Sequence, residues 1–215
     1  MTLLQILLGS SIGRKAVVAA SGAVLALFLA LHLAGSLVTF LGAATFNAYH
    51  AGLHSLGPLL ALLELALAGA LVAHAVFAAW LWVDSLAARP CRYAVPAALR
   101  GRLSSGTMPF TGLLILVFLV VHLADFRFAA SPSPLAAQVV AALQVPPRAA
   151  FYLLAVAALT VHVSHGFWSL FQTLGLSHPG YSALIRQASL AGALGTGGLF
   201  MLIPILILAS RSFLR

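Results

Sequence analysis

Five apolar segments, each long enough to cross a lipid bilayer, constrain this chain more than any other feature of its sequence. They cover about residues 16–40, 57–83, 107–128, 149–174 and 189–210, and each reaches the roughly 20 residues that a transmembrane helix needs. Charged residues make up only 7% of the 215 residues, against about 25% in a typical soluble domain. The sequence therefore predicts an all-α integral membrane protein, a five-transmembrane-helix bundle forming one domain over residues 1–215.

The basic residues indicate topology rather than nucleic-acid binding, because they are scattered between the apolar segments. Four arginines lie between the second and third segments and none between the first and second, so the positive-inside rule places the amino terminus in the cytoplasm and the carboxyl terminus outside. The first segment lacks a cleavage site and is retained. Cys91, the single cysteine, is interpreted as structural. A short surface helix is expected over residues 135–144.

Four histidines, His32, His74, His122 and His162, lie one each inside the first four segments. An imidazole in hydrocarbon is costly and rare, and the economical cause is two haem irons, each held between two helices by two imidazoles. With that topology, His32 and His122 lie roughly 23–26 Å above the inner ends of their helices, and His74 and His162 about 14–18 Å. Depth thus pairs His32 with His122 at an outer haem, and His74 with His162 at an inner haem.

These histidines also allow interpretations without haem. A single intramembrane histidine more often hydrogen-bonds a neighbouring helix than binds a metal, but four at two matched depths favour ligation. A zinc or di-iron centre would need cysteines or carboxylates around them. Gly22, Gly35 and Gly69 make room for a macrocycle, although close helix packing accounts for them equally well. His165, one turn beyond His162, is an alternative ligand or a partner for a haem carboxylate; we expect His162 to be the ligand.

Glu64 is the only acidic residue well inside a predicted span, roughly 15 Å outward of His74. An isolated, buried carboxyl there suggests proton handling. His50 and His54 lie just before that span at the predicted outer surface. The three are candidates for a quinone-binding or proton-transfer site near the outer haem. Solvated histidines are the default alternative for His50 and His54, and the expectation for His178.

Several local strings resemble the cytochrome b subunit of the succinate dehydrogenase and fumarate reductase family, in its five-helix, di-haem form. The resemblance covers nearly the whole chain, and its most specific block is the last one, residues 162–169 together with 171–175. The strings are residues 10–15 (SSIGRK), 31–33 (LHL), 46–49 (FNAY), Glu64, 74–77 (HAVF), 107–108 (TM), 111–112 (TG), 121–123 (VHL), 125–126 (DF), 162–169 (HVSHGFWS) and 171–175 (FQTLG).

This resemblance implies two haem b groups with His32, His74, His122 and His162 as axial ligands. It also implies that a flavoprotein subunit handling succinate and fumarate, and an iron–sulfur subunit, dock on the cytoplasmic face of a bacterial inner membrane. The chain would then pass electrons between the iron–sulfur subunit and a membrane quinone, by resemblance menaquinone, within a succinate:quinone oxidoreductase (respiratory complex II of the tricarboxylic acid cycle). The dicarboxylate chemistry would belong to a partner subunit, and the whole complex could form a higher oligomer.

The chain departs from the family pattern at the start of the third segment. Gly106 stands where related chains often carry an arginine. Basic residues at the inner level are therefore candidates to contact haem propionates or a docked subunit, although most surface arginines do neither. They are Arg14, Lys15, Arg100 and Arg102, with His165 as a further candidate for a propionate.

A second departure is Thr160, two positions before His162, where some fumarate reductases carry a glutamate associated with transmembrane proton movement. We do not expect that proton route here. Two other functions stay open: the haem-b anchor of a formate dehydrogenase, hydrogenase or nitrate reductase, against which the block at 162–169 argues, and a haem-free transporter or assembly factor whose histidines carry protons or metal ions.

Overall fold

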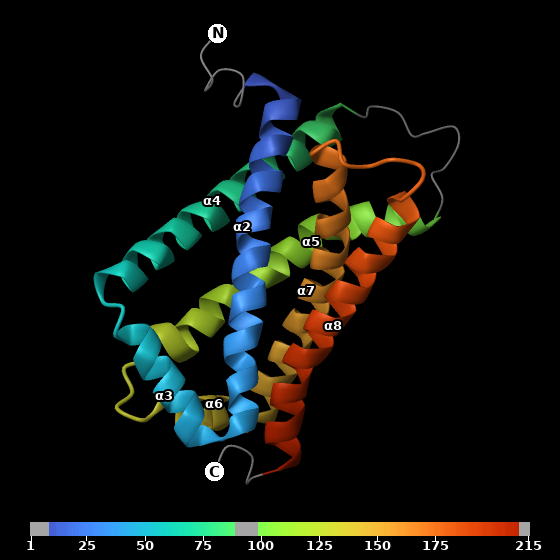
Figure 1. Cartoon of the computed structure of the whole chain (residues 1–215). Coiled ribbons are helices and arrows are strands. Elements are labelled where there is room, and N and C mark those ends of the chain that lie inside the picture. The colour runs from blue at the N-terminus through green and yellow to red at the C-terminus, as the bar shows by residue number, and fades with distance from the viewer. Residues whose placement is uncertain (1–8, 89–98, 211–215) are drawn as a thin grey trace.

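Long helices account for most of this all-α structure, a computed structural model that describes residues 9–88 and 99–210, with side chains described for 9–88 and 106–210 (Figure 1). A 3-10 segment extends the first long helix, and a π-helical segment extends the third. In chain order the elements are α2 (Ser11–Leu37), η1 (Val38–Leu41), α3 (Ala43–His54), α4 (Pro58–Ala87), α5 (Leu99–His122), η2 (Leu123–Arg127), α6 (Leu135–Leu143), α7 (Pro146–Thr173) and α8 (Ser182–Ala209).

Five of these helices have the length and apolar composition to cross a membrane, which confirms the number and order predicted from the sequence. They cover Ser11–Leu41, Pro58–Ala87, Gly106–Arg127, Pro146–Thr173 and Ser182–Ala209. The short helix expected at 135–144 is α6. Several elements depart from expectation: α3 is an additional helix, α2 starts at 11 rather than 16, α5 at 99 rather than 107, and α8 at 182 rather than 189. Each of these extra stretches contains polar residues, so an apolar pattern does not reveal them. The chain is a multi-pass membrane protein.

Helix boundaries follow local signals. The Ser10 hydroxyl caps α2 by accepting a hydrogen bond from the Gly13 N–H at 2.9 Å, which satisfies one of the free donors at a helix start. Proline occupies the first turn of α4 and of α7, where its fixed φ suits the helix and its missing N–H costs no bond. Gly42, at φ 96°, joins η1 to α3 in a conformation that strains residues with a side chain.

The long helices pack in neighbouring pairs. Helix α2 packs along α4, and α7 packs along both α5 and α8. The start of α2 and the end of α8 lie at opposite ends of the bundle (Figure 1), as five crossings require. We call the end where α2 begins the amino-terminal face; α3 and α6 lie at the opposite face (Figure 1).

The buried core lies close to the opposite face, where α6 packs against α3, α7 and α8. The Asn47 side-chain oxygen accepts a hydrogen bond from the Ala136 N–H at 3.0 Å and ties α3 to α6. The core residues are Phe46, Ala136, Val139, Leu143, Tyr152, Ile203 and Ile207.

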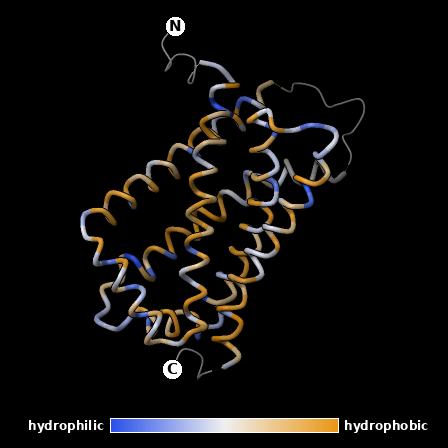
Figure 2. The backbone as a smooth tube through the Cα atoms, in the orientation of Figure 1, coloured by the Kyte–Doolittle hydropathy of each residue, from blue (hydrophilic) through white to orange (hydrophobic). Residues whose placement is uncertain are grey.

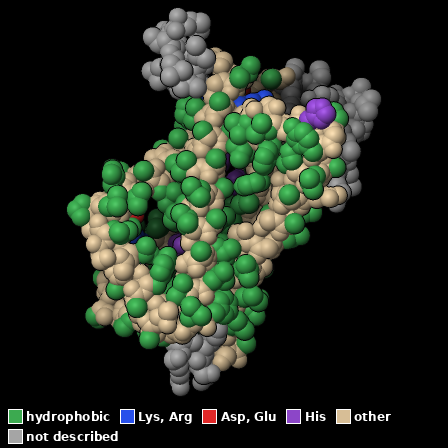
Figure 3. Space-filling view, viewed as in Figure 1, with side chains coloured by type: hydrophobic (Ala, Val, Ile, Leu, Met, Phe, Trp, Pro, Cys, Tyr) green, Lys and Arg blue, Asp and Glu red, His purple; other side chains and the backbone are tan. Residues whose placement is uncertain are grey.

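Along the rest of the bundle, large apolar side chains point outward, among them Leu27, Leu65 and Val120. Helix α4 has no buried residue along its 30 residues. Apolar positions dominate every long helix in Figure 2, and hydrophobic side chains cover much of the face seen in Figure 3. Such a surface suits lipid or an apolar partner rather than water.

Candidate functional site

The first feature of the candidate site is the pair formed by His74 of α4 and His162 of α7. Their ring centroids are 6.3 Å apart, and the ring planes meet at 66°. Both side chains are partly buried. Of the four histidines predicted to be ligands, these two therefore form one close pair between α4 and α7.

Hydrogen bonds fix the orientation of both rings in this pair. The His74 Nδ1 lies 3.1 Å from the Val18 carbonyl oxygen, and because a carbonyl only accepts, this nitrogen carries the proton. The Thr111 hydroxyl lies 3.2 Å from the His162 Nδ1 and has carbonyl acceptors for its own proton within its helix, so it can accept a hydrogen bond from Nδ1. The His74 Nε2 therefore keeps its lone pair, which is the form of imidazole that binds a metal, and the contacts of His162 are compatible with the same tautomer.

The second pair is formed by His32 of α2 and His122 of α5, with ring centroids 5.8 Å apart and nearly perpendicular ring planes. Phe28 stacks on His32 at 5.5 Å. Phe118 and Phe126 lie on either side of His122 in the chain, each with a centroid distance of 5.3 Å. The His122 Nδ1 is buried and has no hydrogen-bond partner among the described residues. This pair thus lies in an aromatic setting, without the hydrogen bonds found at the first.

One face of the bundle is hollowed. Figure 3 shows a hollow next to α2, between α4 and α5, with histidine and acidic side-chain atoms visible inside it. Within the described part of the chain, no group of three or more His, Cys, Asp or Glu side chains is arranged to hold a metal ion. The arrangement therefore consists of separate pairs rather than a cluster of the zinc or di-iron type.

Two of the small residues expected to make room lie against the rings or a neighbour. A Cβ on Gly22 would lie 3.1 Å from the His74 Cε1, whereas one on Gly69 would meet nothing within 4 Å. Gly35 instead accommodates Tyr49, whose hydroxyl would lie 2.5 Å from an added Cβ. Gly22 thus belongs to the His74 site, and Gly35 serves helix packing.

The description of Glu64 as an isolated, buried carboxyl is wrong. Arg127, the last residue of η2, donates to it through Nε at 2.8 Å and through a second nitrogen at 2.9 Å. The Glu64 side chain is 39% exposed and that of Arg127 46%. The physical reason is that the third span ends in a π-helical segment and carries its arginine to α4, a pairing between distant segments that spacing along the chain does not reveal.

His50 and His54 lie together on α3, with their Nε2 atoms 3.1 Å apart. Burial, and then the neighbouring charge of His54, lower the pKa of His50. His54 is near enough to Glu64 to interact with it electrostatically. The three candidates for the quinone or proton site therefore lie in one region, close to the end of the bundle that carries α3.

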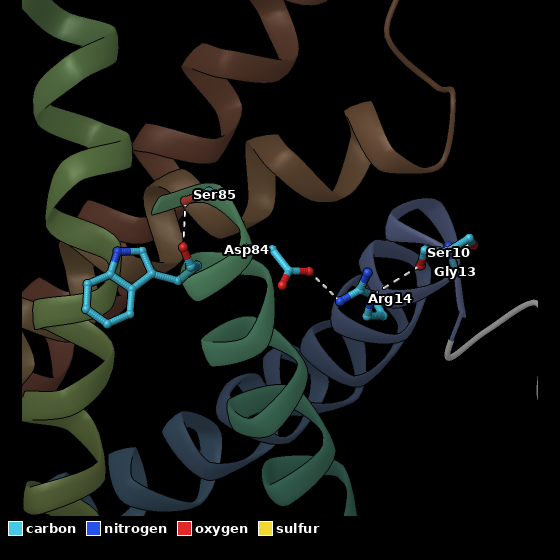
Figure 4. A network of polar contacts seen from close by, with 6 residues as sticks. Ser10, Gly13, Arg14, Asp84 and Ser85 are labelled. Atoms are coloured by element: carbon cyan, nitrogen blue, oxygen red, sulfur yellow. Dashed lines mark hydrogen bonds and ion pairs between the residues drawn. The ribbon is translucent and has the colours of Figure 1, made fainter. Parts of the chain in front are cut away.

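The basic candidates have different surroundings. Arg14 forms an ion pair with Asp84 of α4 (Figure 4). Its guanidinium lies 4.7 Å from the centre of the Trp80 ring. Lys15 is exposed. Arg100 and Arg102 have side chains outside the described residues, as does Cys91. His165 lies on α7, one turn from His162, and is partly buried.

One polar network is not predicted from the sequence. Asp125, within η2, accepts hydrogen bonds from Arg148 at 2.7 Å and from the Tyr152 hydroxyl at 2.7 Å. The Tyr152 ring centroid lies 6.0 Å from that of His122. Asp125 belongs to one of the strings of the family pattern, and its position just after His122 is the signal that could have indicated the network.

These features define a class: an all-α, multi-pass membrane protein with two histidine pairs between its helices. Comparison with family models, with curated proteins and with solved structures finds no match to this chain.

Proposed function

We propose that this chain is the di-haem cytochrome b membrane anchor of a succinate:quinone oxidoreductase, carrying electrons between an iron–sulfur subunit and a membrane quinone. The observation that carries the proposal is the presence of two intramembrane histidine pairs, His32 with His122 and His74 with His162. The identity of the substrate, the partner subunits and menaquinone rest on the resemblance of the sequence strings alone.

The separation within each pair suits two imidazoles on opposite sides of one metal ion. With a metal–nitrogen bond of about 2 Å, each ring centroid lies about 3 Å from the metal, so two opposed rings have centroids about 6 Å apart. The observed distances are 6.3 Å for His74 and His162 and 5.8 Å for His32 and His122. This agreement supports His74 with His162, and His32 with His122, as the residues that would hold one metal ion at each position.

The hydrogen bonds on His74 and His162 support the same assignment. Histidine ligands usually donate a hydrogen bond from the N–H of their second ring nitrogen to a carbonyl or another acceptor. This bond fixes the tautomer and increases the basicity of the ligating nitrogen. The Val18 carbonyl and the Thr111 hydroxyl fill this role here. Gly22 lets the His74 ring lie close to α2.

When bound between two imidazoles, haem iron has no open coordination position, so the chemistry it supplies is electron transfer rather than oxygen activation. The tasks of the protein chain are then to hold the ligand rings, to exclude water with apolar and aromatic side chains, and to tune the group. Phe28, Phe118 and Phe126 surround the His32–His122 pair with apolar surface. The oxidation of succinate would occur on the flavoprotein partner.

Site-specific removal of ligands tests this proposal. Replacing His32 or His122 with alanine should remove one b-type absorption component, and replacing His74 or His162 should remove the other. His178, which lies between α7 and α8 and is exposed, provides the control and should leave both components intact. Loss of the same component from His32 and His74 variants would contradict the pairing.

The two rival functions give different results in the same preparation. The haem-b anchor of a formate dehydrogenase, hydrogenase or nitrate reductase would also bind haem, but would copurify with different partner subunits. A haem-free transporter or assembly factor would show no haem absorption. Purification of the native complex, followed by mass spectrometry of the copurifying subunits, should identify a flavoprotein and an iron–sulfur protein. Other partners would contradict the assignment to succinate and quinone.

A further inference from the structure

Helix α3 carries two histidines whose geometry is independent of the intramembrane pairs. His50 and His54 are one helical turn apart, a spacing that places two side chains on the same face of a helix. Their Nε2 atoms approach to 3.1 Å, and their ring centroids are 4.4 Å apart with the planes at 64°. His54 is exposed and His50 partly so, which leaves the pair accessible from outside the bundle.

The distance between the two nitrogens matches that of two adjacent ligands on one metal ion. With bonds of about 2.05 Å, two ligand nitrogens lie about 2.9 Å apart at a right angle and about 3.3 Å apart at the tetrahedral angle. The observed 3.1 Å falls between these values. An N–H···N hydrogen bond also gives this distance, so the test must separate metal binding from a hydrogen bond between the rings.

We propose that His50 and His54 form a chelating site for a late first-row divalent cation, of which Zn²⁺, Cu²⁺ and Ni²⁺ are the members that imidazole favours. Carboxylate-preferring cations such as Mg²⁺ and Ca²⁺ do not suit two neutral imidazoles. No third His, Cys, Asp or Glu joins the pair among the described residues. Water or an external ligand completes the coordination, so the site binds its cation reversibly.

This site does not depend on the proposed electron-transfer function. It lies near the Glu64–Arg127 ion pair, because His54 interacts electrostatically with Glu64. A bound dication would therefore add positive charge close to the Glu64 carboxylate, a candidate for a quinone or proton site.

Zinc binding to the purified, tag-free full chain tests the proposal, measured by competition with a chromophoric Zn²⁺ indicator. His50→Gln and His54→Gln should each weaken the tightest Zn²⁺ site at least tenfold, because each leaves one imidazole in place of two. His178→Gln is the matched control, since His178 is also exposed and lies outside the membrane-crossing helices. It should leave Zn²⁺ affinity unchanged.

The four intramembrane histidines are present in all three variants, so any contribution they make to Zn²⁺ binding cancels in the comparison. Helix content and melting temperature should match the wild type in each variant. Cu²⁺ bound to the wild type should show electron paramagnetic resonance couplings to two imidazole nitrogens, and to one in His54→Gln. Equal Zn²⁺ affinity in all four proteins, or equal weakening by His178→Gln, would overturn the proposal.

Discussion

Replacing Gly197 with alanine should destabilise the packing of α8 against α7. A Cβ at this position would overlap the Thr160 hydroxyl oxygen and lie 3.1 Å from the Thr160 Cβ. Rotation of the threonine side chain moves the hydroxyl but not the Cβ, so the helices must separate by a few tenths of an ångström. The hydroxyl is also hydrogen-bonded to the Val156 carbonyl at 2.8 Å.

Two opposing effects determine how much Gly197→Ala changes the free energy of unfolding. Alanine is favoured over glycine within a helix by about 1 kcal/mol, whereas forcing extra atoms into a packed interface typically costs about 1–3 kcal/mol. The neighbouring Gly198 isolates the first effect, because a Cβ there would meet nothing within 4 Å. Gly198→Ala should therefore stabilise the fold slightly. The free energy of unfolding of the Gly197→Ala variant should be lower than that of the Gly198→Ala variant by about 1–3 kcal/mol.

The assay is thermal unfolding of the detergent-solubilised chain, followed by circular dichroism. Adding Thr160→Ala to Gly197→Ala removes the overlapping hydroxyl and should recover most of the loss, giving a coupling between the two sites. Equal melting temperatures for the Gly197→Ala and Gly198→Ala variants would refute the reasoning. So would strictly additive effects of the two substitutions at Gly197 and Thr160.

Two further predictions use matched pairs elsewhere in the bundle. Gly22→Ala should lower the melting temperature relative to Gly69→Ala, because an added Cβ at Gly22 would press on the His74 ring at 3.1 Å, whereas one at Gly69 would meet nothing within 4 Å; the same melting temperature in both would contradict this. Glu64→Gln and Arg127→Gln should show a coupling of about 0.2–1 kcal/mol in a double-mutant cycle of unfolding, as half-exposed ion pairs do; additive effects would mean that the bidentate contact contributes nothing to stability.

Much of the fold could be predicted because length and apolar content suffice to locate a membrane-crossing helix. The predicted span at 57–83 corresponds to Pro58–Ala87, and that at 149–174 to Pro146–Thr173. Helix α3 could not be found this way, since Asn47, His50 and His54 interrupt its apolar pattern. Its position is instead fixed by tertiary contacts, such as the hydrogen bond from the Ala136 N–H to the Asn47 side chain.

At the site, depth along each helix is enough to group His74 with His162 and His32 with His122, and the structure brings the same rings together. Their roles as ligands stay predictions. Depth carries no information on rotation about a helix axis, so the partner of Glu64 could not be inferred. The hydrogen-bond partners of the Nδ1 atoms of His74 and His162 could not be inferred from depth either. One of them, the Val18 carbonyl, belongs to the backbone.

Haem stoichiometry tests the central claim most directly. A pyridine haemochrome assay on the purified protein, referred to its amino-acid content, should give two b-type haems per chain. Its reduced-minus-oxidised absorption spectrum should show the sharp bands of low-spin iron with two imidazole ligands. A chain that carries no haem after purification from haem-replete cells, or one that carries a single haem, would contradict the assignment of both histidine pairs.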